Sequence, residues 1–286
     1  MWNREECAAA DAGSVLRWAA RAGKIAVSDR LGKEVPVGEL DWPGARNLRD
    51  LGGRALRDGG VTAPGRVFRS GAPEYLTDEG WRKAQAAGLR TVIDLRNAPA
   101  ETRRAPDRPT IRPESLSGLV FVPAPTEDPG DAEFLRVCGP WLDHPRSWAD
   151  NARLAPARIT AVMRAIASSD GAVLIHCAGG RDRTGMICAM LLVLAGATAD
   201  AIADDYADGW RGAGAYSGHG WVYDPGRQTW REQHQPPSEP GQLRRQLAER
   251  EPALREWIRG FDTGSYLASN GVTDREVGTL KSLLRP

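Results

Sequence analysis

The sequence predicts an α/β fold, because segments with strand patterns alternate with segments of helical periodicity. Residues 66–69 and 89–95 are short segments in which apolar, β-branched and aromatic residues are concentrated, which predicts two strands. Between them, Thr77 is a suitable N-cap for a helix that extends through residue 87. Strand, helix and strand in this order predict one α/β unit.

A second unit follows later in the chain. Four apolar residues recur at the spacing of one helix face, namely Ile159, Val162, Met163 and Ile166. A turn at residues 170–171 then precedes a short buried strand at residues 172–175. A glycine-bearing loop leads from this strand into an apolar helix at residues 184–195. These elements extend the predicted α/β pattern.

Helices are also predicted towards the C-terminus. Residues 199–210 follow Thr198, a suitable N-cap, and a further helix is predicted at residues 242–259. Thr273 and Glu276 have the spacing of a capping box ahead of a last apolar helix face.

Two segments are predicted to lack long regular elements. Residues 97–156 hold ten of the chain's 20 prolines, which predicts a structured loop with a short strand at residues 119–122. Residues 211–240 mix glycine, proline and aromatic residues, and we predict an irregular insertion there. The insertion would either form a lid over a functional site or be a surface loop that its aromatic residues pin to the core.

Length and composition indicate a globular protein with one large domain. The 286 residues divide into an N-terminal extension, 1–41, and a domain over residues 42–286. Formal net charge is +1, which argues against a nucleic-acid partner. The longest apolar run, residues 186–197, is too short to span a bilayer, and the first residues do not resemble an export signal. We therefore expect a cytoplasmic protein that does not span a membrane.

The chemistry of the sequence is concentrated where the strand at 172–175 meets the following helix. A loop between a strand and a helix can direct its backbone N–H groups at an anion, and glycines permit the close approach. We call residues 177–183 the phosphate loop. With its neighbours it reads His176-Cys177-Ala178-Gly179-Gly180-Arg181-Asp182-Arg183-Thr184-Gly185.

Cys177 and Arg183 are the reactive pair that this loop predicts. The helix N-terminus and the nearby guanidinium favour a thiolate, which is a nucleophile, and attack on phosphorus would give a phospho-cysteine. The planar fork of Arg183 can bind two phosphate oxygens. His176 is either a packed residue at the strand end or a donor that orients the loop.

The other cysteines and histidines predict no further site. Cys7, Cys138 and Cys188 are expected to be core residues, and the number and spacing of the cysteines fit no disulfide scaffold. No group of histidines and cysteines has metal-ligand spacing, so we expect no metal and no cofactor.

This loop resembles the signature loop of the protein tyrosine phosphatase superfamily, in particular the bacterial tyrosine phosphatase family that includes a mycobacterial lipid-and-protein phosphatase. Other stretches agree with that family in order. They are residues 46–53, Phe68-Arg69-Ser70, Asp94-Leu95-Arg96, Asp205-Tyr206, Tyr266-Leu267 and Gly271-Val272.

The resemblance implies a mostly parallel sheet of four or five strands flanked by helices, and metal-free hydrolysis of phosphate monoesters. It implies that Cys177 is the nucleophile and Arg183 the phosphate ligand. The loop residues Ala178, Gly179, Gly180 and Arg181 would supply backbone donors, and Thr184 the hydroxyl that steadies the thiolate. One departure is Arg181, where the family typically has lysine.

The larger departure concerns the general acid. Simple counting places Thr126 where related enzymes have an aspartate after the strand that ends at residue 122. Asp128, Glu127 and Asp182 remain candidates for the proton donor. Asp94 and Arg96 are expected to form a structural pair or a rim contact.

The sequence leaves the substrate open between a protein phosphotyrosine, a phosphoinositide and a small biosynthetic metabolite. A phosphate-binding module without turnover is an alternative that the missing acid permits. Sulfur transfer of the rhodanese type also uses a cysteine in an anion-binding loop, but Arg183 and the Thr-Gly pair after it favour phosphate.

Overall fold

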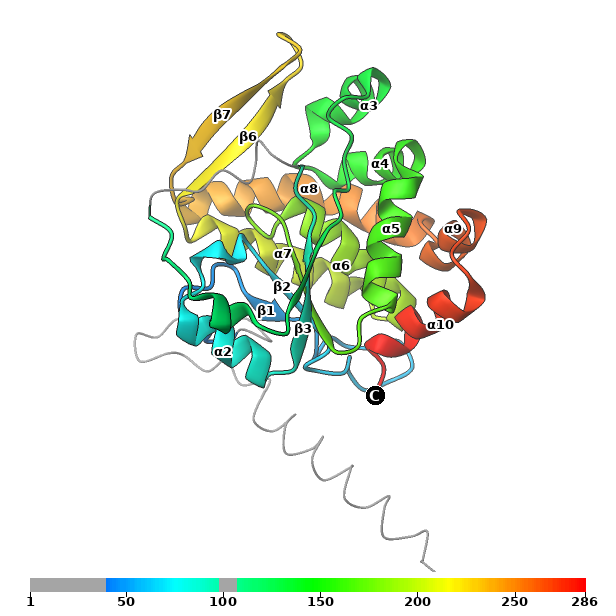
Figure 1. Cartoon of the computed structure of the whole chain (residues 1–286). Helices are drawn as coiled ribbons and strands as arrows, with labels where there is room; N and C mark the ends of the chain where they lie inside the picture. The colour runs from blue at the N-terminus through cyan, green and yellow to red at the C-terminus, as the bar shows by residue number, and fades with distance from the viewer. Residues whose placement is uncertain (1–39, 98–106) are drawn as a thin grey trace, which may run out of the picture.

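A computed structural model describes residues 40–97 and 107–286 (Figure 1). Its centre is a sheet in the order β1-β2-β5-β3-β4. The strands are β1 (Arg49–Asp50), β2 (Val67–Ser70), β3 (Leu89–Asp94), β4 (Val120–Pro123) and β5 (Ala172–His176). Within this sheet only the β1–β2 pairing is antiparallel. The predicted α/β class and mostly parallel sheet are therefore confirmed, and the sheet has five strands where four or five were predicted.

Helices cover both faces of the sheet. On one face, α2 (Asp78–Ala86) packs through Trp81 against a cluster that includes Phe68 and Leu174. A larger core on the other face joins the sheet to most of the remaining helices. They are α4 (Trp148–Leu154), α5 (Pro156–Ala167), α6 (Asp182–Ala195), α7 (Ala199–Gly214), α8 (Pro240–Gly260), α9 (Thr263–Ser269) and α10 (Asp274–Leu283).

The predicted N-caps of three helices are confirmed. Thr77 accepts a hydrogen bond from the backbone of the first turn of α2, and Thr198 does the same for α7. At α10, Thr273 and Glu276 form both halves of a capping box. Short-range side-chain chemistry therefore sets where these helices begin.

The prediction that residues 211–240 lack regular structure is wrong. They hold the end of α7 and an antiparallel hairpin of β6 (Gly218–Asp224) and β7 (Thr229–Gln235), which projects from the body of the molecule in Figure 1. Asp224 accepts hydrogen bonds from two backbone N–H groups of the turn, those of Gly226 and Arg227. Pro225 and Gly226 form the turn, but the other glycines and prolines of the segment lie in α7, in β6 and around the start of α8, so the composition of the whole segment conceals the two strands.

The Pro-rich region 97–156 is also more regular than predicted. It contains the predicted strand as β4 and two helices, α3 (Ala132–Cys138) and α4, with 3₁₀ turns η3 (Pro113–Leu116), η4 (Gly139–Trp141) and η5 (Pro145–Ser147). Asp131 caps α3, and the 3₁₀ turns place prolines at their first or second position, where no N–H is needed. Residues 98–106 of this region and nearly all of the 1–41 extension lie outside the described residues.

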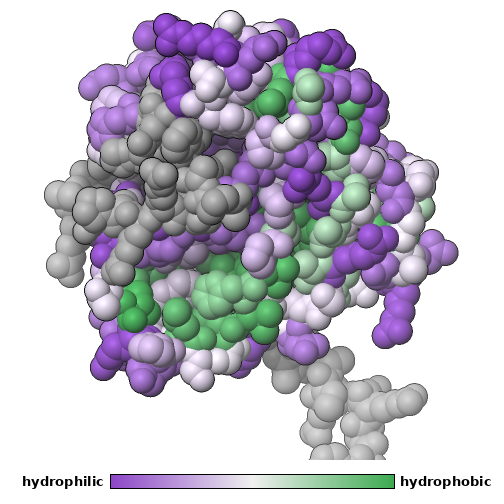
Figure 2. Space-filling view, turned by 45° about the horizontal axis from the view of Figure 1, so that its top comes forward, coloured by the Kyte–Doolittle hydropathy of each residue, from purple (hydrophilic) through white to green (hydrophobic). Residues whose placement is uncertain are grey.

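Strand β4 is the outer strand of the sheet on one side. Val120 and Phe121 of this strand are 58% and 48% exposed. Figure 2 shows that one face of the molecule carries a hydrophobic patch. None of the helices in residues 40–97 and 107–286 combines the length and the apolar character that crossing a bilayer requires.

Candidate active site

The phosphate loop lies at the carboxyl edge of the parallel strands. Strand β5 ends at His176, and α6 begins at Asp182. His176 pairs in register with Ser70 of β2 and with Asp94 of β3, so both neighbouring strands end beside the loop. This edge is where open α/β sheets bind their ligands, and the N-terminus of α6 favours an anion there.

Two backbone contacts fix the loop against the chain that follows β2. The N–H of Ala72 donates to the carbonyl of Ala178 at 2.9 Å. Gly180 has a φ of +67°, and a Cβ at this position would overlap the carbonyl of Ser70. The glycine is therefore required by both its dihedral angle and its close approach to β2.

Cys177 is the first residue of the loop and is 4% exposed. Thr184, in the first turn of α6, is fully buried, and its Oγ1 has no hydrogen-bond partner in the structure. A buried hydroxyl without a partner is rare, because an unpaired polar group costs about 1–3 kcal/mol. This hydroxyl fits the role that the family resemblance gives it, a donor to a thiolate.

Arg183 faces a carboxylate from a distant part of the chain. Its Nη1 lies 3.4 Å from Oε2 of Glu127, and the amide of Asn97 donates to the same oxygen at 3.2 Å. Glu127 is 5% exposed. Of the three candidate acids, Glu127 is therefore the one in contact with the predicted phosphate ligand.

Asp182 and Arg181 form a pair within the loop. Nε of Arg181 donates to Oδ2 of Asp182 at 2.7 Å, whereas Oδ1 of this carboxyl is buried without a hydrogen-bond partner. Burial raises the pKa of Asp182 above its ordinary value, against the opposing effect of Arg181. A raised pKa is what a carboxyl needs to hold a proton near neutral pH.

Asp128 has the opposite environment. It accepts hydrogen bonds from Arg158 at 2.8 Å and from the N–H of Gly130 at 3.1 Å. These interactions, that with Arg158 foremost, lower its pKa. The side chain is 40% exposed. Asp128 is thus a solvated carboxylate held by an arginine of α5.

The side chain of Arg181 is held by residues that the sequence analysis did not single out. It stacks on one ring face of Trp210 at 4.0 Å from the centroid, and Arg250 stacks at 4.2 Å. Asp143 binds Arg250 at 3.1 Å and lies 4.0 Å from Arg181. Arginine in place of the family's lysine fits this site, because a planar guanidinium stacks on an aromatic ring.

His176 is buried at the end of β5. Its Nδ1 lies 3.3 Å from the carbonyl of Cys177 and 3.8 Å from Oδ1 of Asp94. Burial lowers the pKa of His176, which favours a neutral ring. Asp94 in turn accepts two hydrogen bonds from the side chain of Arg96, at 2.8 and 2.7 Å, as the predicted structural pair.

Comparison with known proteins decides the family. A sequence model of the tyrosine phosphatase family matches residues 40–285. The chain belongs to this family. It is therefore a protein tyrosine phosphatase-like phosphoric monoester hydrolase.

Three relatives are bacterial proteins. One, from Cupriavidus necator and assigned to the tyrosine-protein phosphatases, is 28% identical over 67% of this chain and 72% of its own length. The triple specificity protein phosphatase PtpB of Mycobacterium tuberculosis is 28% identical over 58% of this chain and 67% of its own. A tyrosine-protein phosphatase of Nostoc commune is 33% identical over 46% of this chain and 44% of its own length.

Behind the phosphate loop of this phosphatase lies a buried ion network. Arg69 pairs with Asp205 of α7, and Arg54 contacts Asp205 at 3.2 Å and Asp208 at 3.0 Å. The sequence offered a signal for two of these residues, since Arg69 and Asp205 lie in stretches that resemble the family. Their position behind the loop could be found only from the fold.

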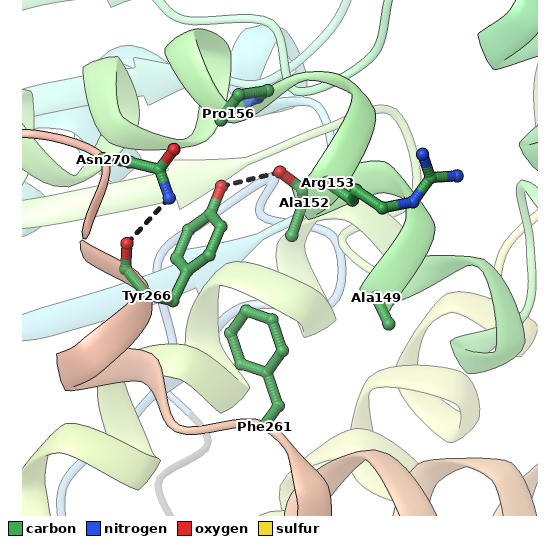
Figure 3. A pocket seen from close by; sticks show the side chains of 7 residues that line it. All are labelled: Ala149, Ala152, Arg153, Pro156, Phe261, Tyr266 and Asn270. Carbon is green, nitrogen blue, oxygen red and sulfur yellow. Dashed lines mark hydrogen bonds between the residues drawn. The ribbon is translucent and has the colours of Figure 1, made fainter. Parts of the chain in front are cut away.

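A separate pocket lies away from the phosphate loop, between α9 and the helices α4 and α5 (Figure 3). Tyr266 crosses it and donates to the carbonyl of Ala152 at 2.9 Å, and Asn270 donates to the carbonyl of Tyr266 at 2.8 Å. Within the described residues, no group of three or more histidine, cysteine, aspartate or glutamate side chains is arranged to hold a metal ion.

Proposed function

We propose that this phosphatase hydrolyses phosphate monoesters through a phospho-cysteine intermediate, with Cys177 as the nucleophile. The observation that carries the proposal is the phosphate loop, which begins with Cys177 after β5 and ends with Arg183 in the first turn of α6, and in which groups outside the loop bind the carbonyls of Ala178 and Gly180. Such a loop leaves backbone N–H groups to bind phosphate oxygens. We take residues 42–286 as the catalytic domain, which the family match over residues 40–285 supports.

In the first step, the Cys177 thiolate forms the S–P bond while the P–O bond to the leaving group breaks. The Arg183 fork and the loop N–H groups bind the phosphoryl oxygens, where negative charge is concentrated in the transition state. The leaving oxygen takes a proton from a carboxylic acid. In the second step, water attacks phosphorus and the S–P bond breaks. The carboxylate that the first step left behind accepts a proton from the attacking water. The Thr184 hydroxyl donates to the departing thiolate.

Asp182 is our choice for the proton donor. Burial raises its pKa, and one of its oxygens has no hydrogen-bond partner in the structure. The lowered pKa of Asp128 makes that carboxyl a poor acid at neutral pH. Glu127, which contacts Arg183 and Asn97, is the remaining candidate.

Phosphotyrosine in proteins is the substrate that the family favours. Phosphoinositides and small phosphorylated metabolites are further candidates, and the M. tuberculosis relative is named as a triple specificity phosphatase. The cationic side chain of Arg181, 21% exposed at the loop, suits a substrate with a second anionic group. A dual-specificity enzyme would accept more than one of these classes.

The test is release of phosphate from p-nitrophenyl phosphate in the presence of a metal chelator, followed by a panel of phosphotyrosyl peptides, phosphoinositides and sugar phosphates. Turnover of p-nitrophenyl phosphate supports the proposal. This substrate is chosen because its leaving group hardly needs an acid, so the test does not depend on which carboxyl donates the proton. Binding of phosphate without turnover would indicate a phosphate-binding module instead. The highest kcat/KM in the panel identifies the substrate class.

A further inference from the structure

The geometry points to Asn47 as a positioning residue that sets the shape of the phosphate loop and joins it to α7. The inference rests on the proposed function in that it takes residues 177–183 as an oxyanion site. It concerns a side chain outside this loop, on the segment that precedes β1.

Asn47 donates to carbonyls on two separate elements. Its Nδ2 lies 2.7 Å from the carbonyl oxygen of Gly179 and 3.2 Å from that of Gly180. The same nitrogen lies 2.9 Å from the carbonyl oxygen of Gly209 in α7. Asn47 is 6% exposed, so its amide is largely withdrawn from water and makes these bonds within the protein.

The carbonyls that Asn47 binds determine where the loop N–H groups point. In a planar peptide unit the carbonyl and the following N–H point in opposite directions. Because Asn47 holds the Gly179 and Gly180 carbonyls on the outer side, the N–H groups of Gly180 and Arg181 are directed to the other side. Arg69 reinforces the arrangement by donating to the Gly180 carbonyl at 2.8 Å. Preorganised N–H groups of this kind stabilise an oxyanion without reorganisation.

The orientation of the Asn47 amide is itself fixed. Its Oδ1 accepts a hydrogen bond from the guanidinium of Arg49, which is 2% exposed. Oxygen must therefore face Arg49, and nitrogen must face the carbonyls. The backbone of Asn47 has a φ of +53°, a conformation that asparagine and glycine adopt more readily than most residues.

Two glycines of α7 make room for this contact. A Cβ at Gly212 would overlap Oδ1 of Asn47, and a Cβ at Gly209 would lie 2.6 Å from Nη2 of Arg69. A side chain at either position would force Asn47 or Arg69 to shift, so glycine lets α7 lie close to the loop. Asn47 thereby links the phosphate loop to α7, the helix that precedes the β6–β7 hairpin.

The experiment replaces this amide by an isosteric carboxylate. Asn47→Asp keeps the contact with Arg49 and tolerates the positive φ, but it sets an oxygen against the carbonyls of Gly179 and Gly180. We expect kcat/KM for p-nitrophenyl phosphate to fall by about 10²-fold, as for loss of an oxyanion donor. We expect vanadate to bind at least about tenfold more weakly, and the alkylation of Cys177 by iodoacetamide to require a higher pH.

The matched control is Asn270→Asp. Asn270 also donates to a backbone carbonyl, that of Tyr266 at 2.8 Å, in the pocket of Figure 3 that no phosphate-loop residue lines. This variant should keep wild-type kcat/KM, vanadate affinity and alkylation profile. Asn47→Gly, which fits the positive φ and adds no charge, provides a second test and should weaken vanadate binding in the same direction.

The outcomes separate this inference from the proposed function. If the wild type binds vanadate but does not turn over p-nitrophenyl phosphate, the proposed function fails, and weaker vanadate binding by Asn47→Asp still supports the inference. If folded Asn47 variants bind vanadate as the wild type does, the inference is overturned. Melting of both Asn47 variants below the assay temperature would also overturn it, since Asn47 would then serve the fold as a whole.

Discussion

Nη1 of Arg183 lies 3.4 Å from Oε2 of Glu127, a carboxylate that is 5% exposed. The cation that we assign to phosphate is therefore also faced by an acidic side chain. A phosphate dianion bound to Arg183 would meet this negative charge at close range, in surroundings where water screens poorly. Two like charges about 4 Å apart repel by about 1 kcal/mol in bulk water, and by more at a protein surface, where the effective dielectric constant is lower.

Removing this charge should strengthen anion binding. We expect Glu127→Gln to lower the dissociation constant of phosphate and vanadate by about five- to tenfold, because the glutamine keeps the shape and loses the charge. Isothermal titration calorimetry measures the effect. The control is Glu133→Gln, which removes the charge of an exposed side chain of α3. Unchanged or weaker anion binding would contradict the prediction. A rate loss confined to substrates with poor leaving groups would favour Glu127, in place of Asp182, as the general acid.

The covalent mechanism makes Cys177 indispensable for turnover but not for binding. Cys177→Ser should abolish phosphate release while vanadate or phosphate binding survives, since a hydroxyl is a far weaker nucleophile and leaves the loop intact. Arg183→Lys should lose most activity, because lysine cannot bind two oxygens with a planar fork. Persistent activity of Cys177→Ser would exclude the phospho-cysteine, and near-normal kinetics of Arg183→Lys would remove the role of the fork.

Assignment of the acid can be checked by leaving-group dependence. Asp182→Asn should slow alkyl phosphates and phosphotyrosine by roughly 10²–10⁴-fold and p-nitrophenyl phosphate much less, because only poor leaving groups need the proton. Asp128→Asn, which alters a carboxylate bound to Arg158, serves as the comparison and should be silent. The reverse pattern would assign the proton to Asp128.

Local signals account for the parts of the fold that the sequence predicts well. Thr77, Thr198 and Thr273 each cap a helix through residues within three positions, so the pattern is visible in a short window. The β6–β7 hairpin was missed because glycine and proline counts over 30 residues conceal two paired strands around a short turn. Strand pairing depends on a partner segment, which composition does not specify.

The same distinction separates the parts of the site. The phosphate loop is contiguous, so its cysteine, glycines and arginine could be predicted together. Asn47 and Arg69 bind the carbonyl oxygens of the loop from 132 and 111 positions away, at Gly179 and Gly180 respectively. Spacing cannot reveal a contact of that range. Nor could counting along the chain distinguish the environments of the three candidate acids.

His176 should make the stability of the protein depend on pH. Burial lowers its pKa below the ordinary value of 6.5, so the folded protein keeps the ring neutral while the unfolded chain accepts a proton. The unfolded state thus binds more protons as pH falls through about 6.5, and unfolding becomes more favourable.

Thermal melts between pH 7.5 and pH 5 should show a falling melting temperature, with a shallower slope for His176→Gln. His144, whose pKa is also lowered by burial, remains in both proteins. Equal slopes in the two proteins would show that His176 does not contribute.

The last prediction is that residues 211–240 help to choose the substrate. Their hairpin is anchored near its turn, where Tyr223 is 9% exposed and lies against Gly139, so a Cβ at Gly139 would be 2.7 Å from the ring. Tyr216, which precedes the hairpin, is 42% exposed, and its ring centroid lies 5.7 Å from the guanidinium of Arg46. Arg46 is the neighbour in sequence of Asn47, which binds the phosphate loop. An aromatic side chain in this place can cover a planar or apolar part of a substrate and exclude water. Replacing residues 216–235 by a short Gly/Ser linker should therefore lower kcat/KM for the preferred substrate class much more than for p-nitrophenyl phosphate, with the melting temperature little changed. Equal losses on both substrates, or unfolding, would instead indicate that the hairpin only pins this surface to the core.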